Sequence, residues 1–289
     1  MSNEEVEKTK YVRLPMYFLY FLAVFFVFAL ATKPNIISSS DLHPKIINYK
    51  IGIVSDIHAA SQKIRAKSTP GNTVYPNRYI QLLPESLEKM KKERTELVIN
   101  LGDFTNNDSV KHAETIKVLT DQSEMEEIWV PGNHDDEETK KILGMMNNYY
   151  FFDKHDWRII VLDSSEGPDN KENFSAYVDY DGGIGNVQLN WLKDALKTNK
   201  DIAIAMHHPI WDKKTISYIN PIYSDFQKII EESGHVRYVF SGHWHTSYWE
   251  KELNNINYYG IPALSLDGME GFYKTIDLPY YYYDNYEPT

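Results

Sequence analysis

The chain alternates short apolar runs with longer amphipathic segments, which is the pattern of strands and helices in turn. Five of the apolar runs have the length of buried strands, and each is followed within a few residues by Asp, Asn or His. These runs are Ile51–Ser55, Leu97–Leu101, Glu126–Val130, Ile202–Met206 and Val236–Phe240. The polar residues that follow them are Asp56, His58, Asp103, Asn133, His134, His207, His243 and His245.

The segments between these runs have helical spacing. Leu83, Leu87 and Met90 recur at intervals of four and three, and Pro84 suits a first helical turn, so a helix is predicted over Pro84–Arg94. Three more helices are predicted over Ser109–Thr120, Thr139–Met146 and Val187–Leu196. Strands that alternate with helices favour parallel pairing through right-handed crossovers.

Two further strand signals lie outside this series. Trp157–Leu162 is a sixth apolar run, and Phe272–Leu278 is a candidate for the last strand. Asn254-Asn255 separates two aromatic-rich segments, which is typical of a tight hairpin turn. These segments therefore add strands without adding a further ligand-binding motif.

The five polar strand endings predict one common site. The carboxyl ends of strands in an α/β sheet are where ligands collect, because the turns there face a crevice. Imidazole, carboxylate and amide oxygen suit hard and borderline divalent ions. The chain contains no cysteine, which disfavours a closed structural zinc site. The composition of the site therefore predicts bound metal.

The ordered series Asp-x-His, Gly-Asp, Gly-Asn-His-Asp, His-His-Pro and Gly-His-x-His, which runs from Ile51 to His245, resembles the calcineurin-like metallophosphoesterase family. The set is specific, although each motif alone is weak. The resemblance implies an α/β fold, a sandwich of two mixed β-sheets flanked by helices (α/β/β/α). It implies one metal held by Asp56, His58, Asp103 and His245, and a second held by Asp103, Asn133, His207 and His243, with Asp103 as the bridge.

The same resemblance implies the chemistry of a hydrolase that acts on phosphate ester bonds. Two divalent ions bring four positive charges, and Asp56 and Asp103 remove two, so the centre still attracts phosphate. The nucleophile would be a hydroxide on the metals, since coordination lowers the pKa of water to about 7. His134 adjoins a ligand and would donate a proton to the leaving oxygen or stabilise the transition state. His208 could contact its neighbour His207.

Several alternatives stay open on sequence alone. The segments Asp181–Leu192 and His207–Pro209 resemble the branch related to class III cyclic nucleotide phosphodiesterases, which makes a 3′,5′-cyclic nucleotide an alternative substrate. A different class of function is a non-catalytic, membrane-associated scaffold that keeps the phosphoesterase fold. Such relatives generally lose ligands, and here every ligand position is filled. The residues do not choose among manganese, iron and zinc.

The N-terminus predicts contact with a membrane. Leu14–Ala31 is almost wholly apolar and follows Lys8, Lys10 and Arg13. This run is longer than the apolar core of about 7–15 residues in a signal peptide, and shorter than the roughly 20 residues that span a bilayer. Cleavage before Thr32 and retention as an anchor both remain open. Either way, the basic flank stays inside and the rest of the chain is delivered outside the cytoplasm.

We therefore expect four regions: a signal peptide or anchor over 1–31, a polar spacer over 32–45, a metallophosphoesterase domain over 46–279, and a Tyr-rich tail over 280–289. The formal charge of −11 over 289 residues disfavours a general nucleic-acid binder, and no duplex nucleic acid is expected as a partner. The expected partners are a phosphate ester, for which a nucleotide is one candidate, and a membrane if the N-terminal segment is retained.

Overall fold

The computed structural model describes residues 44–61, 73–106, 110–165, 182–211, 219–245 and 247–282. Ile46–Tyr281 forms one compact unit. The predicted leader over 1–31 lies outside the described residues, as do 32–43 of the spacer and 283–289 of the tail. No helix in the described ranges is both long enough and apolar enough to cross a bilayer.

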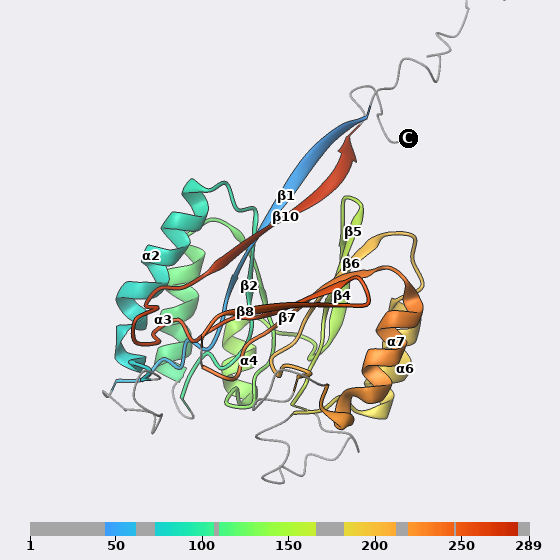
Figure 1. The fold of residues 1–289 in the computed structure, drawn as a ribbon. Helices are drawn as coiled ribbons and strands as arrows, with labels where there is room; N and C mark the ends of the chain where they lie inside the picture. The colour runs from blue at the N-terminus through green and yellow to red at the C-terminus, as the bar shows by residue number, and fades with distance from the viewer. Residues whose placement is uncertain are drawn as a thin grey trace, which may run out of the picture. The chain divides into compact units, whose positions relative to one another are not determined.

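The described strands form two sheets. The first has the order β10-β1-β2-β3, with bounds Lys274–Tyr282, Lys45–Val54, Leu97–Asn100 and Glu126–Trp129. β1, β2 and β3 are parallel to one another, and Figure 1 shows β10 running opposite to β1. This sheet is therefore mixed, with its parallel strands ending at one edge.

The second sheet has the order β4-β5-β6-β7-β9-β8. Its strands span Tyr150–Lys154, Trp157–Val161, Asp201–Ala205, Val236–Ser241, Ile256–Gly260 and Trp249–Leu253. The outer pairs β4/β5 and β8/β9 are antiparallel, whereas β5, β6, β7 and β9 pair in parallel. Both sheets are mixed, as the sequence predicts.

Each sheet buries both of its faces because successive side chains of a strand point to opposite sides. On β1, Ile51 and Ile53 join the core shared by the two sheets, while Val54 joins the core beneath the helices. On β6, Ala203 and Ala205 face the shared core, and Ile202 and Ile204 lie in the helix-facing core. The two sheets therefore pack face to face.

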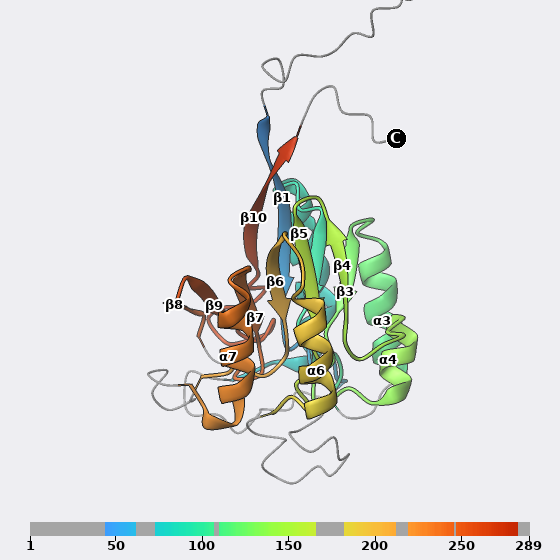
Figure 2. The same ribbon diagram turned by 90° about the vertical axis from the view of Figure 1, so that its right-hand side faces the viewer.

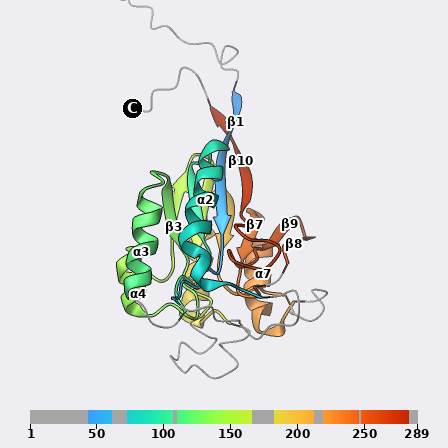
Figure 3. The same cartoon turned by 90° about the vertical axis from the view of Figure 1, so that its left-hand side faces the viewer.

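Helices cover the two outer faces (Figures 1, 2 and 3). The first sheet is covered by α2 (Tyr79–Lys92), α3 (Val110–Asp121) and α4 (Glu137–Leu143). The second sheet is covered by α6 (Asn186–Ala195) and α7 (Ser224–Ser233). Short 3₁₀ turns, Pro76–Arg78 and Pro221–Tyr223, precede α2 and α7. The predicted α/β/β/α order is confirmed.

Helix α2 corrects one predicted boundary. The sequence places its start at Pro84, but the helix begins at Tyr79 and carries Pro84 in its interior. Proline there removes one backbone hydrogen bond. Burial of Tyr79, Leu83 and Leu87 against the sheet offsets that loss, because the apolar stripe continues through the proline.

The sequence missed two elements and placed a third correctly. β4 was missed because alternate positions of the strand are exposed, and α7 because only Phe226 and Ile230 of the helix are fully buried. The hairpin of β8 and β9 is confirmed, with Asn254 and Asn255 at φ of 50° and 63°. Two left-handed residues in succession are what a type I′ turn requires.

Candidate metal centre

The predicted ligands gather at the carboxyl ends of parallel strands. Asp56 follows β1, Asp103 follows β2, His207 follows β6 and His243 follows β7. Two groups of side chains bring their ligand atoms within 4.8 Å of one another. The groups are Asp56, His58, Asp103 and His245, and His207, His208 and His243. Residues as distant in sequence as Asp56 and His245 thus share one site.

The backbone at this site is strained in a consistent way. Five of the predicted ligands have left-handed backbone conformations that non-glycine residues rarely adopt. Their φ values are 51° for Asp56, 46° for His58, 54° for Asp103, 68° for His243 and 53° for His245. Each such residue costs about 1–2 kcal/mol, and the conformation persists only when the surroundings fix it. The fold therefore holds these side chains in place at the expense of stability.

Asp103 has one oxygen tied to the fold and one facing the site. Its Oδ1 accepts a hydrogen bond of 2.9 Å from the backbone N–H of His134. Its Oδ2 lies 3.5 Å from His58 Nε2 and 3.2 Å from His207 Nε2. One carboxylate oxygen thus contacts a member of each ligand group, which is the arrangement that a bridging ligand needs.

Asp56 divides its oxygens in the same manner. Its Oδ2 accepts hydrogen bonds from the backbone N–H of His243, at 2.9 Å, and from the hydroxyl of Ser55. Its Oδ1 lies 3.0 Å from His245 Nε2 and 3.7 Å from His58 Nε2. Both carboxylates are fully buried, so the negative charge of their site-facing oxygens acts only within the site.

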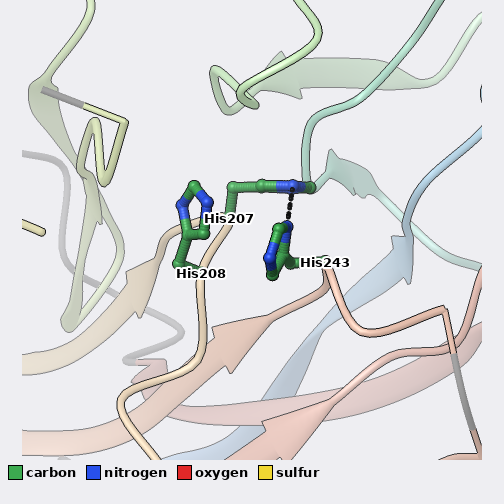
Figure 4. Close-up of side chains that lie close together, drawn as sticks. All are labelled: His207, His208 and His243. Carbon is green, nitrogen blue, oxygen red and sulfur yellow. Dashed lines mark hydrogen bonds between the residues drawn. The ribbon is translucent and has the colours of Figure 1, made fainter. Parts of the chain in front are cut away.

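The histidine nitrogens also converge. His207 Nδ1 donates to the carbonyl oxygen of Leu101 at 2.6 Å, which leaves the Nε2 lone pair for an ion. That Nε2 is 3.3 Å from His243 Nδ1 (Figure 4). On the other side, His58 Nε2 and His245 Nε2 are 2.7 Å apart. Imidazole nitrogens facing one another in pairs suit a cation placed between them.

The charges of these aspartates and histidines shift one another's pKa values. Burial alone would raise the pKa of Asp56, but His245 and His58 hold it well below its usual value. Burial would likewise raise the pKa of Asp103, and His207 and His58 outweigh that effect. Burial lowers the pKa of His207, yet Asp103 raises it to about 10. Burial together with His207 lowers the pKa of His243 to about 3.

Buried oxygens without hydrogen-bond partners show whether these residues are suited to bind metal ions. Asp56 Oδ1, Asp103 Oδ2 and Asn133 Oδ1 are buried and hydrogen-bonded to no other described group. An unsatisfied buried polar atom costs about 1–3 kcal/mol, and more when the group is charged. Oxygen and imidazole donors without thiolate are ligands that hard and borderline divalent ions accept. The residues therefore fit divalent cations.

The turn that carries Asn133 passes unusually close to Asp103. A Cβ on Gly132 would lie 2.3 Å from both Asp103 N and Asp103 Oδ1. Gly242 approaches the other carboxylate similarly, since its Cβ would lie 2.5 Å from Asp56 Oδ2. Only glycine permits this packing, and the Gly-Asn-His-Asp and Gly-His-x-His motifs supply it.

Asp135 is a supporting residue that the sequence analysis did not identify. Its carboxylate accepts three backbone hydrogen bonds, from Asp103 at 2.9 Å, Phe104 at 2.8 Å and Gly132 at 2.9 Å. Burial, together with the charge of Asp103, raises its pKa to about 7. Asp135 thus ties the loop after β2 to the loop after β3. Its position as the last residue of Gly-Asn-His-Asp was the available signal.

His134 and His208 stand apart from the predicted ligands in different ways. His134 belongs to neither ligand group and is only half-buried, and its ring centroid is 5.1 Å from that of His58. It can therefore reach a molecule that enters from solvent. His208, by contrast, is fully buried and joins the group of His207 and His243 (Figure 4).

Known proteins resemble this chain in sequence and in fold. The family model described as calcineurin-like phosphoesterase matches residues 49–247. A probable cyclic nucleotide phosphodiesterase of Fibrobacter succinogenes is 23% identical over 209 residues, which cover 68% of this chain and 73% of that protein. The crystal structure of a dimetal phosphatase from Danio rerio matches with a TM-score of 0.62 at 15% identity, over 75% of this chain and 88% of that chain.

Proposed function

Because the chain belongs to the calcineurin-like phosphoesterase family, we propose that it hydrolyses a phosphomonoester or phosphodiester outside the cytoplasm. The family prediction made from the motifs is confirmed, and the protein is a metal-dependent phosphoesterase. The single observation that carries the site assignment is Asp103, whose Oδ2 lies between His58 Nε2 and His207 Nε2. A scaffold without catalysis has no need for a buried, strained carboxylate at that point.

The residues would divide between two divalent ions that share Asp103. Asp56, His58 and His245 would complete one site, and Asn133, His207 and His243 the other. When bound, the ions supply Lewis acidity, which polarises the phosphoryl group and makes water nucleophilic at neutral pH. With both aspartates ionised, the four positive charges of the ions leave two in excess, which attract an anionic ester.

The remaining task is proton delivery to the leaving group, and His134 is placed for it. The hydrogen bond from its backbone N–H to Asp103 Oδ1 fixes the position of the residue beside the bridging carboxylate. Its ring stands edge-on to that of His58 and remains partly exposed. An imidazole in that position can donate a proton to the departing oxygen or stabilise charge on the phosphoryl group.

A 3′,5′-cyclic nucleotide is the second candidate substrate. The relative from Fibrobacter succinogenes bears the description "probable cyclic nucleotide phosphodiesterase", and 73% of its length is covered. The segment around Gln188, which the sequence analysis relates to the same branch, contributes a hydrogen-bond pair with Asp163. That pair supports helix packing and does not distinguish a cyclic diester from other esters.

Location outside the cytoplasm is supported by the N-terminal sequence. Basic residues precede the apolar run Leu14–Ala31, and such charges stay on the cytoplasmic side. A reporter enzyme fused to the C-terminus, active only outside the cytoplasm, would test this orientation. Activity that disappears when the apolar run is deleted supports export, and equal activity without the run contradicts it.

A substrate panel tests the function itself. The full chain, purified in mild detergent and loaded with Mn²⁺, would be assayed on aryl phosphomonoesters, bis-aryl phosphodiesters and 3′,5′-cyclic nucleotides. Hydrolysis that depends on added metal and is lost in Asp103→Asn supports the proposal. Equal rates of hydrolysis by the wild type and Asp103→Asn on every substrate contradict the proposal. A preference for cyclic nucleotides selects the second candidate substrate.

A further inference from the structure

Three exposed apolar side chains lie at the amino end of β1, the end opposite to the metal centre. Ile46 is 67% exposed, Ile47 is 37% exposed and Tyr281 is 60% exposed, and we call these three residues the apolar tip. Ile46 and Ile47 lie near the start of β1, and Tyr281 lies near the end of β10, the strand beside it (Figures 1 and 2). Clustered apolar side chains on a surface mark an interaction site, whereas scattered ones do not.

The apolar tip exposes both faces of the ribbon that β1 and β10 form. Ile46 and Ile47 are consecutive in a strand, so their side chains point to opposite faces. The strand is exposed from Lys45 to Asn48, and burial begins at Tyr49. A protein partner would cover one face of such a ribbon, whereas a lipid interface surrounds both. Tyrosine also suits that interface, because its ring is apolar and its hydroxyl reaches water.

β10 is poorly suited to pair with a strand from a second copy of the chain. In the order of the described strands it pairs with β1 and stands at the edge of the sheet. Pro279 lies within β10, and proline has no N–H to donate to an added strand. The Pro279 carbonyl oxygen already accepts a 2.8 Å hydrogen bond from Trp157 Nε1. The apolar tip therefore favours an occupant that needs no backbone pairing.

Two contacts fix the apolar tip to the second sheet. The backbone N–H of Tyr281 donates a 2.8 Å hydrogen bond to Asp156 Oδ2. The ring of Tyr280 stacks on that of His155, with their centroids 3.8 Å apart. Asp156 and His155 lie between β4 and β5. An orientation imposed on the apolar tip is therefore passed on to the sheets.

The sequence before the apolar tip contains the apolar run of the proposed membrane location. Leu14–Ala31 is separated from Ile46 by the 14 residues 32–45, which span at most about 50 Å. A membrane that holds the run is therefore within reach of the apolar tip. Tethering makes the contact intramolecular and raises its effective concentration, so three side chains suffice where a free domain would need more.

We propose that the apolar tip inserts into the interface of the membrane that holds the N-terminal run, and that this contact turns the metal centre away from the bilayer. The inference rests on the membrane location in the proposed function. β1 rises about 3.3 Å per residue from Ile46 to Val54, so the centre at Asp56 lies roughly 25–30 Å from the apolar tip. The esters that reach the centre are then those in solution, and not phospholipids of the same bilayer.

Fluorescent labels test the contact, because the chain contains no cysteine and one introduced cysteine gives one labelled position. Asn48→Cys places the label at an exposed position beside the apolar tip. Val187→Cys is the matched control. Val187 is 58% exposed, and its neighbour Gln188 accepts a hydrogen bond from the N–H of Asp163 just after β5, so the control lies at the edge that carries the metal centre.

The labelled full chain would be reconstituted in phosphatidylcholine vesicles, with and without lipids that carry a nitroxide quencher near the head group. We expect quenching at Asn48→Cys and none at Val187→Cys. In the triple variant Ile46→Ser, Ile47→Ser and Tyr281→Ser, the ratio of bound to free tip should fall about tenfold or more, because burying one large apolar side chain already shifts an equilibrium by about that factor. Hydrolysis of a soluble aryl phosphate by the triple variant should equal that of the wild type.

Equal quenching at both positions, or none at either, in chains that float with the vesicles would overturn the proposal. Quenching that the triple variant retains would do the same, and if that variant does not fold, the comparison of the two labels decides. A disulfide that forms between copies of Asn48→Cys in detergent and disappears in the triple variant would assign the apolar tip to a second copy instead. Failure of the wild-type chain to float would refute the membrane location in the proposed function.

Discussion

Replacing Gly132 by alanine is the sharpest test of how the backbone builds the centre. The new Cβ would lie 2.3 Å from the backbone nitrogen and the Oδ1 of Asp103, whereas ordinary contacts of a Cβ are 3.4–4 Å. One loop must therefore move by about 1 Å. Because Asp103 contacts both ligand groups, the shift displaces its Oδ2 relative to His58 and His207 together.

Misplacement of reacting groups by about 1 Å costs on the order of 10²-fold in rate. We therefore expect Gly132→Ala to lose about 10²-fold in kcat/KM on a generic aryl phosphate with saturating Mn²⁺, and to lower the free energy of unfolding by about 1–3 kcal/mol. Initial rates, metal per chain and thermal unfolding would be measured on the same preparations.

Gly144→Ala is the matched control. Gly144 ends α4 with φ of 83°, and no heavy atom lies within 4 Å of its hypothetical Cβ. Alanine there carries only the strain of a left-handed residue, about 1–2 kcal/mol, and should leave turnover unchanged. Wild-type turnover in Gly132→Ala would refute the close approach to Asp103, and a 10²-fold loss in Gly144→Ala would show that strain alone explains the effect.

Three further outcomes follow from the same structure. Asp103→Asn keeps an acceptor for the N–H of His134 but no longer offers an anionic bridge, so metal content should fall below two ions per chain; full occupancy would contradict the bridging role. His134→Ala should retain both ions and slow turnover about 10²–10⁴-fold, and equal rates would exclude His134 from proton delivery. Burial raises the pKa of Glu127 from 4.5 to about 7, so its folded form holds a proton more tightly and stability falls as the pH rises through that window. In denaturant titrations, Glu127→Gln should therefore stabilise the protein by up to about 3 kcal/mol at pH 8 and should leave its stability unchanged at pH 4. The control Glu252→Gln, at an exposed position, should leave the stability unchanged at both pH values. Equal effects of Glu127→Gln at the two pH values would contradict the raised pKa of Glu127.

The apolar runs specified the strands because a strand buried on both faces must be apolar almost throughout. Ile51–Val54 and Leu97–Asn100 lie where the sequence places them. Elements that show one face to solvent were harder to find, since half of their residues are polar. β4 was missed for this reason, whereas the first turn of α2 was missed because Pro84 suits a helix start.

The candidate site was predictable in its composition because the carboxyl ends of parallel strands meet at one edge. Asp56, Asp103 and His207 could therefore be placed together without coordinates. The residues that hydrogen-bond with this site inside the fold could not be predicted in that way. No local pattern indicates that Asp135 accepts three backbone hydrogen bonds, or that the Ser164 hydroxyl accepts one from the backbone N–H of His208, 44 residues away.

By itself, then, the sequence indicated which polar residues follow the buried strands, because strand periodicity and the residue after each strand are local properties. Only the tertiary structure decided how each donor is used. The division of each carboxylate into an oxygen that faces the fold and one that faces the site, and the left-handed backbone at Asp56 and Asp103, depend on loops that meet across two sheets. Contacts between segments distant in the chain set those details, and such contacts leave no periodic trace in the sequence.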